Sequence, residues 1–415
     1  MSEGANRGYR PRVADAELQA GLRRAGAVLI EGVRACGKTE TAQQAAGSAV
    51  HLDRDPATLA LAAIDPVLVL DGETPRLIDE WQLAPQLWNA VRGQVDGRKA
   101  PGQFILTGSS APSADAARHT GAGRFARLRM RTMTMVETGF STGEVSLEAL
   151  LNAEAPRATD AGLSFATLTE RLVVGGWPGY QDLAPSDASR NLADYLETIA
   201  SVDLHSLDGQ SRDPVRVMRL LTALARSTAT EVTISTLARD EASMSRDAVR
   251  EYLAALERIF VVENQPAWAT HLRSSATLRK EPKRHFADPS LAAAALRAYP
   301  EALRRDPAFT GQLFESLVVH DLRVFSAPLG GVVQHARDSA GREVDAIIAL
   351  PDGSWAGFEV KLGSDPTVID GAAAGLVAFA AQVSPPVALT VIASSGPSYR
   401  RTDGVNVVAI GSLGR

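Results

Sequence analysis

The sequence predicts a multidomain α/β protein, with a parallel sheet near the N-terminus, helices in the middle and a second α/β region at the C-terminal end. Three observations lead to this fold class. An apolar run of strand length, a glycine-rich loop and a stretch of helix-compatible residues follow one another over residues 27–46. Apolar residues recur at helical spacing between residues 186 and 227. Two apolar segments that carry acidic residues, 343–348 and 355–361, flank a Pro-Asp-Gly-Ser turn.

The glycine-rich loop, residues 32–39, has the pattern G-x-x-x-x-G-K-T. With a strand before it and a helix after it, this pattern is typical of a phosphate-binding loop, because backbone N–H groups and the helix N-terminus attract phosphate. Lys38 is expected to reach the outer phosphates of ATP, and the Thr39 hydroxyl to hold Mg²⁺. The nucleotide contacts are assigned to the loop and the first helical residues: Gly32, Arg34, Ala35, Cys36, Gly37, Lys38, Thr39 and Glu40.

Composition favours a cytoplasmic enzyme that does not enter a membrane. No apolar run reaches the roughly 18 residues that span a bilayer, and the N-terminus lacks the apolar core of a signal peptide. The only cysteine, Cys36, lies inside the loop, so no intrachain disulfide can form. The net charge of −5 means that nucleic acid could bind only at a local basic patch. Because the chain has only five lysines, each marks a candidate site for a compact ammonium, and Lys38 and Lys361 are two of them.

Two acidic residues end the strand predicted at residues 76–80. Asp79 is expected to hold the magnesium through water, and Glu80 to orient or activate the attacking water. Two acids after an apolar run can also simply begin a loop. Their position about 40 residues after the phosphate loop, with another strand following, favours a hydrolytic pair. The other elements of this half are expected as a helix at 17–24, a strand at 50–53 and a helix at 55–64.

The strand predicted at residues 104–110 ends in small hydroxyl residues, among them Ser109. A polar side chain here would lie between the two acids and the outer phosphate, although an ordinary serine- and glycine-rich strand exit has the same composition. Arg124 precedes the next predicted strand, 125–130. It is a candidate arginine finger for its own nucleotide or, in a homo-oligomer, for that of a neighbouring subunit. Alternatively, it pairs with a surface carboxylate.

Five segments, taken in chain order, resemble the AAA-type (AAA+) ATPases of a large, poorly characterised bacterial and archaeal family. They are residues 32–39, 78–82 and 106–110, the pair Gly123-Arg124, and Glu137. The resemblance runs nearly from end to end, and it implies an AAA-like parallel sheet followed by a C-terminal domain of unknown function. Val33 and Thr132 stand where relatives often carry proline, and neither difference removes a chemical group from the predicted nucleotide site.

The middle of the chain is expected to be a helical connector. Residues 146–160 are rich in alanine and glutamate and are expected to form a linker or lid helix. Amphipathic helices are predicted at residues 163–174, 186–203 and 212–227, with a Gly-Gly-Trp-Pro-Gly-Tyr break after the first. These helices carry no cluster of catalytic residue types, so we interpret them as structural.

A short helix at 234–239, a turn, a longer helix at 246–259 and a strand at 260–262 outline a winged helix, which the resemblance also favours. The second helix offers Arg246 and Arg250 to a DNA major groove, and the basic run 279–285 could contact phosphates. DNA or another nucleic acid is therefore a candidate partner. Many winged helices, however, serve only as packing surfaces for protein.

The C-terminal segment carries a second set of candidate site residues: Glu315 within a helix, Asp345 on one strand, and Glu359 and Lys361 on the next. An acid on one strand and E-x-K on the next is the signature of the restriction-endonuclease-like fold. There the acids hold Mg²⁺ at the scissile phosphate, and the lysine assists the attacking water. The alternative is a fold that has lost cleavage and only binds a partner.

The register of the predicted hairpin decides whether these acids meet. Side chains on a strand alternate between its faces, so a two-residue turn at Asp352-Gly353 would place Asp345 opposite Val360 and away from Glu359. We therefore expect a one-residue bulge near one of the hairpin glycines, Gly353 or Gly357, to bring the acids together.

Together these features predict a Mg²⁺-dependent ATPase whose nucleotide cycle controls a winged-helix and nuclease-like C-terminal half. Two alternatives remain open: an ATP-gated, metal-dependent nuclease, and an ATP-dependent signalling switch that acts through protein contacts. The predicted division of the chain is an ATPase domain at residues 1–145, a helical connector at 146–230, a winged helix at 231–295 and a restriction-endonuclease-like domain at 296–415.

Overall fold

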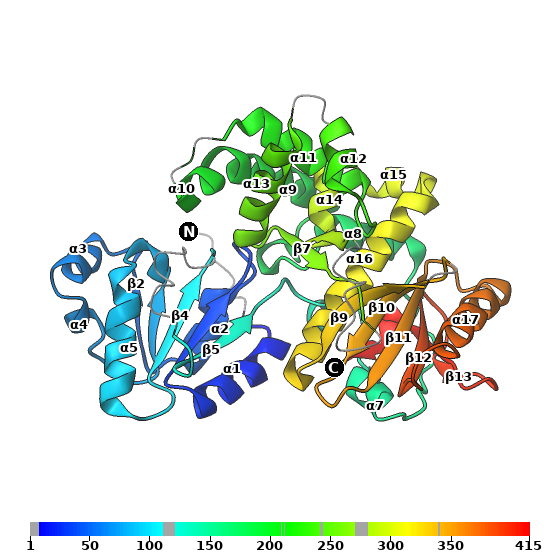
Figure 1. Ribbon diagram of the computed structural model, residues 1–415, viewed down its shortest axis with the longest axis horizontal. Helices are drawn as coiled ribbons and strands as arrows, with labels where there is room; N and C mark the ends of the chain where they lie inside the picture. The colour runs from blue at the N-terminus through cyan, green and yellow to red at the C-terminus, as the bar shows by residue number, and fades with distance from the viewer. Residues whose placement is uncertain are drawn as a thin grey trace, which may run out of the picture. The chain divides into compact units, whose positions relative to one another are not determined.

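The computed structural model describes residues 8–110, 121–208, 210, 212–240, 244–269, 281–338 and 341–415. The chain forms two compact units, Met1–Met130 and Arg131–Arg415 (Figure 1). The second unit holds all three segments predicted to follow the ATPase domain, and the finer division into four domains stays a prediction. Among the residues that the structure describes, no helix combines the length and the apolar character that crossing a membrane requires.

The first unit is built on a five-stranded, all-parallel sheet with the strand order β2-β3-β4-β1-β5. Its strands lie close to the predicted positions: β1 (Ala27–Glu31), β2 (Ser48–His51), β3 (Arg76–Asp79), β4 (Phe104–Gly108) and β5 (Phe125–Arg129). Every residue of β1 and β4 is buried, as expected of central strands in a sheet covered on both faces. Parallel strands share one carboxyl edge, so the segments that follow β1, β3 and β4 meet there.

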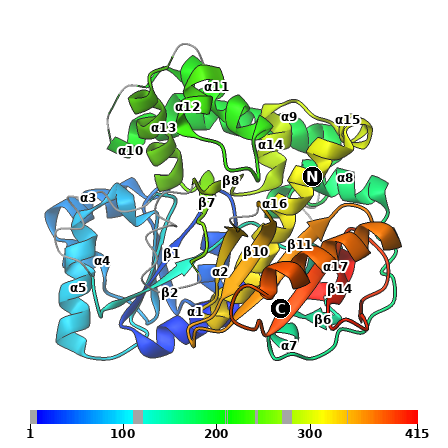
Figure 2. The ribbon, with the colours of Figure 1, turned by 45° about the vertical axis from the view of Figure 1, so that its right-hand side comes forward.

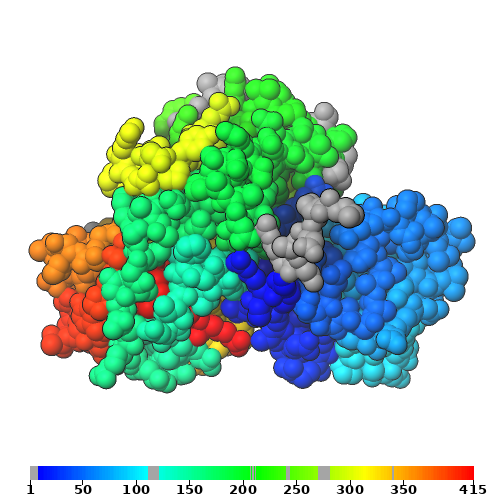
Figure 3. All heavy atoms as spheres, turned by 180° about the vertical axis from the view of Figure 1, so that it is seen from behind, coloured from blue at the N-terminus to red at the C-terminus, as the bar shows by residue number. Residues whose placement is uncertain are grey.

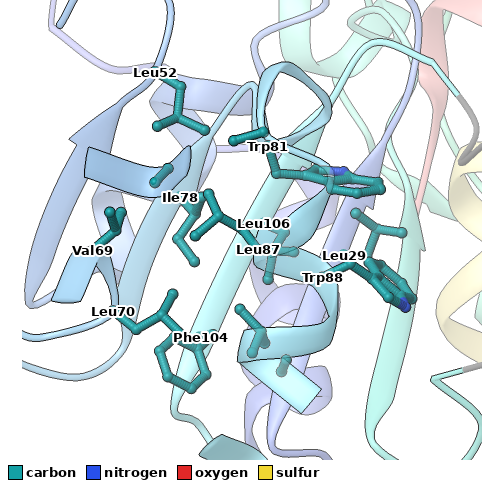
Figure 4. Close-up of a cluster of buried hydrophobic side chains, with 14 of the residues drawn as sticks. Leu29, Leu52, Val69, Leu70, Ile78, Trp81, Leu87, Trp88, Phe104 and Leu106 are labelled. Atoms are coloured by element: carbon teal, nitrogen blue, oxygen red, sulfur yellow. The ribbon is translucent and has the colours of Figure 1, made fainter. Parts of the chain in front are cut away.

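Helices cover both faces of this sheet (Figure 1). One face carries α1 (Val13–Arg24) and α2 (Lys38–Ala45), and the other carries α3 (Pro56–Ile64), α4 (Pro66–Val69) and α5 (Gln86–Arg98). On the second face, Leu29 and Phe104 belong to one apolar cluster with Trp81 and Trp88, in which Phe104 lies beside Leu70 (Figure 4). The Trp88 ring also stacks on Phe125, with centroids 4.2 Å apart. This apolar core, which also contains Leu106, anchors the strands whose ends carry the candidate site.

The second unit begins with mainly helical structure. Its helices are α6 (Met135–Thr138), α7 (Leu147–Leu151), α8 (Phe165–Val174), α9 (Pro185–Thr198), α10 (Leu204–Asp208), α11 (Pro214–Arg226), α12 (Ile234–Asp240), α13 (Arg246–Arg258), α14 (Pro289–Ala295) and α15 (Pro300–Arg305). A π-helical turn, Ile199–Asp203, joins α9 to α10. The buried helix α14 packs against α8, α9 and α11. Helices that are far apart in sequence therefore share one core.

A small antiparallel pair of strands follows α13. It consists of β7 (Val262–Gln265) and β8 (Lys283–Phe286), and Thr230 adds a single bridge to Arg284 of β8. The predicted strand at 260–262 thus begins two residues later, because Phe260 takes a left-handed backbone conformation with φ of 65°. The order of helix, helix and strand pair agrees with the outline predicted from the sequence.

The C-terminal part of the second unit is a mixed six-stranded sheet of order β13-β14-β12-β11-β10-β9. Its elements are α16 (Pro307–Ser326), β9 (Val332–Arg337), β10 (Glu343–Ala349), β11 (Trp355–Lys361), α17 (Pro366–Ala380), β12 (Ala388–Ala393), β13 (Tyr399–Arg400) and β14 (Asn406–Ala409). Neighbouring strands from β9 to β11 are antiparallel, whereas β11, β12 and β14 are parallel. Figure 2 shows α17 alongside β11, where Ile369 and Leu376 join a core with Trp355.

The end of the chain returns to the start of this unit. Strand β15 (Leu413–Gly414) pairs in parallel with β6 (Val145–Ser146), and the Ser141 hydroxyl donates to the Leu413 carbonyl over 2.6 Å. In Figure 3 the red C-terminal atoms border the turquoise segment that contains β6. The pairing joins segments of this unit that are about 270 residues apart in sequence.

Thr132, which the family resemblance marks as a departure from proline, belongs to a buried polar network. Its hydroxyl lies 2.7 Å from Asp288 Oδ2 and 3.0 Å from His320 Nε2. His320 Nδ1 lies 2.8 Å from Asp321 Oδ1. Burial raises the pKa of the Asp321 carboxyl. A proline at position 132 would have no hydroxyl for this network, so the departure has a structural role here.

Candidate functional site

The predicted phosphate loop joins β1 to α2 at the carboxyl edge of the parallel sheet. Lys38 is only 5% exposed, and its Nζ donates to the carbonyl oxygens of Gly32 and Val33, both over 2.9 Å. The Thr39 hydroxyl, in the first turn of α2, donates to Asp79 Oδ1 over 2.8 Å. The ammonium thus bonds the loop's own carbonyls. The same donors could bond phosphate oxygens after a side-chain rotation.

Two loop glycines are required by the geometry. A Cβ atom at Gly32 would lie 2.1 Å from the carbonyl oxygen of Met130, and Gly37 caps α2 with φ of 103°. Arg12 supports the loop, because its guanidinium donates to the Cys36 carbonyl over 3.0 Å. Cys36 itself is fully buried, so its side chain packs beneath the loop and does not face solvent.

Asp79 has hydrogen-bond partners on both of its carboxylate oxygens. It is 1% exposed, and its Oδ1 accepts hydrogen bonds from the hydroxyls of Thr39 and Thr107, while Oδ2 lies 2.9 Å from His51 Nδ1. A carboxylate and a hydroxyl oxygen 2.8 Å apart are the hard oxygen donors that Mg²⁺ prefers. The residues present therefore fit the predicted Mg²⁺. Thr39 would lie beside the ion, and Asp79 lies next to Thr39.

Glu80 lies at the same edge in a conformation that is unusual for a residue with a side chain. Its φ of 55° is in the left-handed region, which costs on the order of 1 kcal/mol and occurs preferentially at functional sites. Gln82 Nε2 donates to Glu80 Oε2, and Ser109 Oγ lies 3.4 Å from the same oxygen. The structure thus brings Glu80 and Ser109 together, as the sequence predicts, and adds Gln82 as a third member.

His51 is a member of this site that the sequence analysis missed. It ends β2, and the parallel register pairs it with Asp79 at the end of β3. Together with Asp53, these residues offer three ligand atoms within 4.8 Å of one another. The signal was present as His-Leu-Asp at the end of a predicted strand. It could be used only once β2 and β3 were known to be neighbours.

Arg124 does not lie where it could act on its own nucleotide. It precedes β5, and its carbonyl accepts the N–H of Ala27, the first residue of β1. Because β1 and β5 are parallel, Arg124 lies at the amino edge, and the loop begins one strand length, about 16 Å, away. Its guanidinium pairs with Asp96 over 2.9 Å, with both side chains about half exposed. The expectation of a finger acting on its own subunit is therefore wrong, and a role on a neighbouring subunit stays a prediction.

The second set of candidate site residues lies at one end of the C-terminal sheet. Lys361 Nζ donates to Glu359 Oε1 over 2.7 Å, and the Val360 N–H donates to Asp345 Oδ2 over 2.9 Å. Glu315 of α16 joins them through a buried lysine, Lys283 of β8. All four residues predicted for this site therefore lie in one cluster.

The hairpin reaches this arrangement by a route different from the predicted one. Ala349 pairs with Trp355 and Ala346 with Phe358, so the next residues outward are Asp345 and Glu359. The Leu350 N–H donates to the Ser354 carbonyl, so three residues, 351–353, form the turn between them, with Gly353 at φ of 85°. No bulge is needed between β10 and β11. The irregularity lies instead between β10 and β9. The two-residue turn assumed in the sequence analysis is wrong.

Lys283 is a buried cation of this region that the sequence did not indicate. It is 2% exposed, and its Nζ lies 2.6 Å from Glu315 Oε1, 2.6 Å from Glu343 Oε1 and 3.3 Å from Asp345 Oδ1. Burial alone would lower the pKa of this ammonium, but the attraction of the three carboxylates outweighs it and raises the pKa. Lys283 is therefore a charged group inside the cluster.

The same finding corrects the interpretation of the basic run 279–285. Residues 279 and 280 lie outside the described residues. Lys283, Arg284 and His285 are all less than a tenth exposed. Arg284 donates to the Val232 carbonyl and pairs with Glu281. Phosphate contacts by these three side chains are therefore excluded in this conformation, whereas Arg246 and Arg250 of α13 are exposed.

Burial also makes two acids of this cluster, Glu359 and Glu315, weaker acids. The pKa of Glu359 is raised from 4.5 to about 7, first by burial and then by repulsion from Asp345. The pKa of Glu315 is raised for the same two reasons. At these two residues the folded chain holds protons that the unfolded chain releases above pH 4.5, so their contribution to the free energy of unfolding falls as pH rises from about 4.5 to 7.

Glu359→Gln is expected to reduce this pH dependence, because glutamine cannot ionise. The loss of slope should approach 1.4 kcal/mol per pH unit at most, the value for one proton. Urea unfolding of the metal-free chain at pH 5, 6 and 7 measures it. Glu144→Gln, a change at an exposed glutamate of the same unit, serves as the control. An unchanged slope in Glu359→Gln would mean that Glu359 is ionised throughout this range.

Successive parts of the chain match three known families. Residues 24–139 match the family described as an AAA domain. Residues 166–302 and 310–413 match families described as domains of unknown function, DUF8612 and DUF4143. The first match confirms the prediction of an AAA-type ATPase domain around the phosphate loop, and it supports ATP binding and hydrolysis. The restriction-endonuclease-like and winged-helix assignments have no such support and stay predictions.

Relatives along most of the chain are also known. The uncharacterized proteins Rv2008c of Mycobacterium tuberculosis and Mb2031c of Mycobacterium bovis are each 27% identical over 365 residues, which is 86% of this chain and 75% of theirs. Among solved structures, the Walker-type ATPase PABY2304 of Pyrococcus abyssi is 13% identical with a TM-score of 0.42, over 70% of this chain and 99% of that one. A structural likeness this weak carries no argument about function.

Proposed function

We propose that the chain is a Mg²⁺-dependent ATPase whose nucleotide cycle controls its C-terminal unit. The observation that carries the proposal is the contact between Thr39 Oγ1 and Asp79 Oδ1, at 2.8 Å. This contact joins the phosphate loop to Asp79 at the end of β3, and Glu80 is the next residue in the chain. Loop, metal-binding oxygens and a candidate base at one edge of a parallel sheet are the parts that phosphoryl transfer to water needs.

Each residue has a definite role in this proposal. Lys38 leaves the two loop carbonyls and binds the outer phosphates, while backbone N–H groups of the loop bind the remaining oxygens. Bound Mg²⁺ would neutralise developing charge on the phosphate oxygens. Glu80 accepts a proton from the attacking water, and Ser109 and Gln82 hold its carboxylate in place. In a homo-oligomer, Arg124 would approach the nucleotide of the neighbouring subunit.

Nucleic acid is the proposed target of the second unit. The support is the sequence of helices α12 and α13 with the pair β7–β8, an order typical of winged helices, in which α13 exposes Arg246 and Arg250. ATP turnover by the full chain, measured with and without single- and double-stranded DNA, tests this. Stimulation that disappears at high salt would support it. A rate of ATP turnover that neither single- nor double-stranded DNA changes would favour the signalling switch.

A metal-dependent nuclease is the second candidate function, and the gathering of Asp345, Glu359 and Lys361 at the end of one hairpin favours it. The expected result is Mg²⁺-dependent cleavage of DNA or RNA that Asp345→Ala abolishes, because the carboxylate at the end of β10 would be lost as a metal ligand. ATP turnover by the same variant should equal that of the wild type. Cleavage that survives Asp345→Ala would come from a contaminant or another site.

A further inference from the structure

Three carboxylates from two elements converge on Lys283. Glu315 comes from α16, and Glu343 and Asp345 come from β10, while the lysine itself comes from β8. An ammonium has three N–H donors, so one donor is available for each carboxylate. The measured separations, from 2.6 to 3.3 Å, agree with this count.

We propose that Lys283 is the built-in cation of this cluster and that it competes with a divalent metal ion for the same carboxylate oxygens. The inference concerns metal binding to the chain without nucleotide or nucleic acid, and it does not depend on whether the chain hydrolyses ATP. If the chain cuts nucleic acid with a metal ion at Asp345, Lys283 has to leave the cluster first. Its basis is the geometry: Nζ lies among Glu315 Oε1, Glu343 Oε1 and Asp345 Oδ1, the oxygens that a hard divalent ion would use.

The two cations exclude each other on physical grounds. Mg²⁺ or Mn²⁺ would need its carboxylate oxygens within about 2.0–2.2 Å, so it would lie only a few ångströms from the ammonium. In a buried cluster the repulsion between those charges is screened far less than in water. Metal can therefore enter only when the lysine side chain moves out.

The second lysine of the cluster provides a contrast. Lys361 is 34% exposed, and within the described part of the chain its one ion pair is with Glu359, over 2.7 Å. Its ammonium can swing into solvent at little cost, since water replaces the lost contact. Lys283 has no such freedom, because it is 2% exposed and its strand is paired with β7. Movement of the β7–β8 pair, next to helix α13, is thus the event that would open the cluster to metal.

Mn²⁺ titration of the full chain, without nucleotide and by isothermal calorimetry, tests the proposal. In the wild type we expect no Mn²⁺ binding that depends on Asp345, as judged by comparison with Asp345→Asn. Lys283→Met should gain one Mn²⁺ per chain, and Lys283→Met/Asp345→Asn should lose it again. Lys361→Met is the matched substitution: it removes a cation from the same cluster but leaves Lys283 in place, so it should gain no site.

Two results would overturn the proposal. One is wild-type Mn²⁺ binding that Asp345→Asn removes, because metal and Lys283 would then coexist. The other is a folded Lys283→Met chain that gains no Mn²⁺. Thermal unfolding provides a second readout: Lys283→Met should melt lower than the wild type, and Mn²⁺ should raise its midpoint but leave that of the wild type unchanged. If Lys283→Met does not fold, the wild-type comparison with Asp345→Asn decides.

Discussion

Replacing Glu80 by glutamine is expected to stop ATP turnover while ATP remains bound. Glutamine keeps the shape of the side chain and can still contact Ser109, but it cannot accept a proton from water. Loss of a general base typically lowers the rate by 10²–10⁴-fold. The measurement is phosphate release at saturating ATP, together with ATP affinity by calorimetry. The affinity should stay within a few-fold of the wild-type value, because Glu80 lies beyond the loop that binds the phosphates.

Glu73→Gln is the matched control for this change. Glu73 is exposed and belongs to the same unit, so its replacement should alter neither binding nor turnover. Unchanged turnover in Glu80→Gln would remove Glu80 from the mechanism. The left-handed backbone at position 80 and the contacts with Gln82 and Ser109 would then have a purely structural explanation.

Replacing Lys38 by alanine is expected to weaken ATP binding itself. The ammonium would be the strongest partner of the outer phosphates, and losing one member of a buried charge pair costs 2–5 kcal/mol, which is about 30-fold or more in affinity. Calorimetry with ATP and Mg²⁺ measures this. Lys99→Ala, at an exposed lysine of the same unit, should bind as the wild type does. Equal affinity in Lys38→Ala would mean that the lysine keeps its bonds to Gly32 and Val33 when nucleotide binds.

The nucleotide site could be predicted from sequence because its information is local. A strand, a glycine loop and a helix in direct succession place Lys38 and Thr39, and a second strand places Asp79 and Glu80. His51 depends on which strands are neighbours, a property that no single segment contains. Its contact with Asp79 arises from the β2–β3 register alone.

Arg124 shows how strand direction limits a motif-based prediction. The pair Gly123-Arg124 follows the phosphate loop in sequence as an arginine finger would, yet it lies at the amino edge of the sheet. The parallel pairing of β1 with β5 decides this, and the sequence before β5 contains no sign of it.

Four members of the C-terminal cluster were predictable, but Glu343 and the buried cation Lys283 were not. Glu359 and Lys361 share a face because they are two residues apart on one strand. Lys283 was interpreted as part of an exposed basic run, since its sequence neighbours are polar. Its burial results from packing against α16 and β10, which are about 30 and 60 residues further along the chain.

The central claim is that the chain hydrolyses ATP at the phosphate loop with Mg²⁺, and phosphate release by the full chain tests it most directly. The assay compares Mg²⁺ with EDTA, and the wild type with Lys38→Ala. We expect release with Mg²⁺ that EDTA stops and that Lys38→Ala lacks. Release that continues in EDTA or in Lys38→Ala, or a wild-type chain that binds ATP but releases no phosphate with Mg²⁺, would contradict the claim.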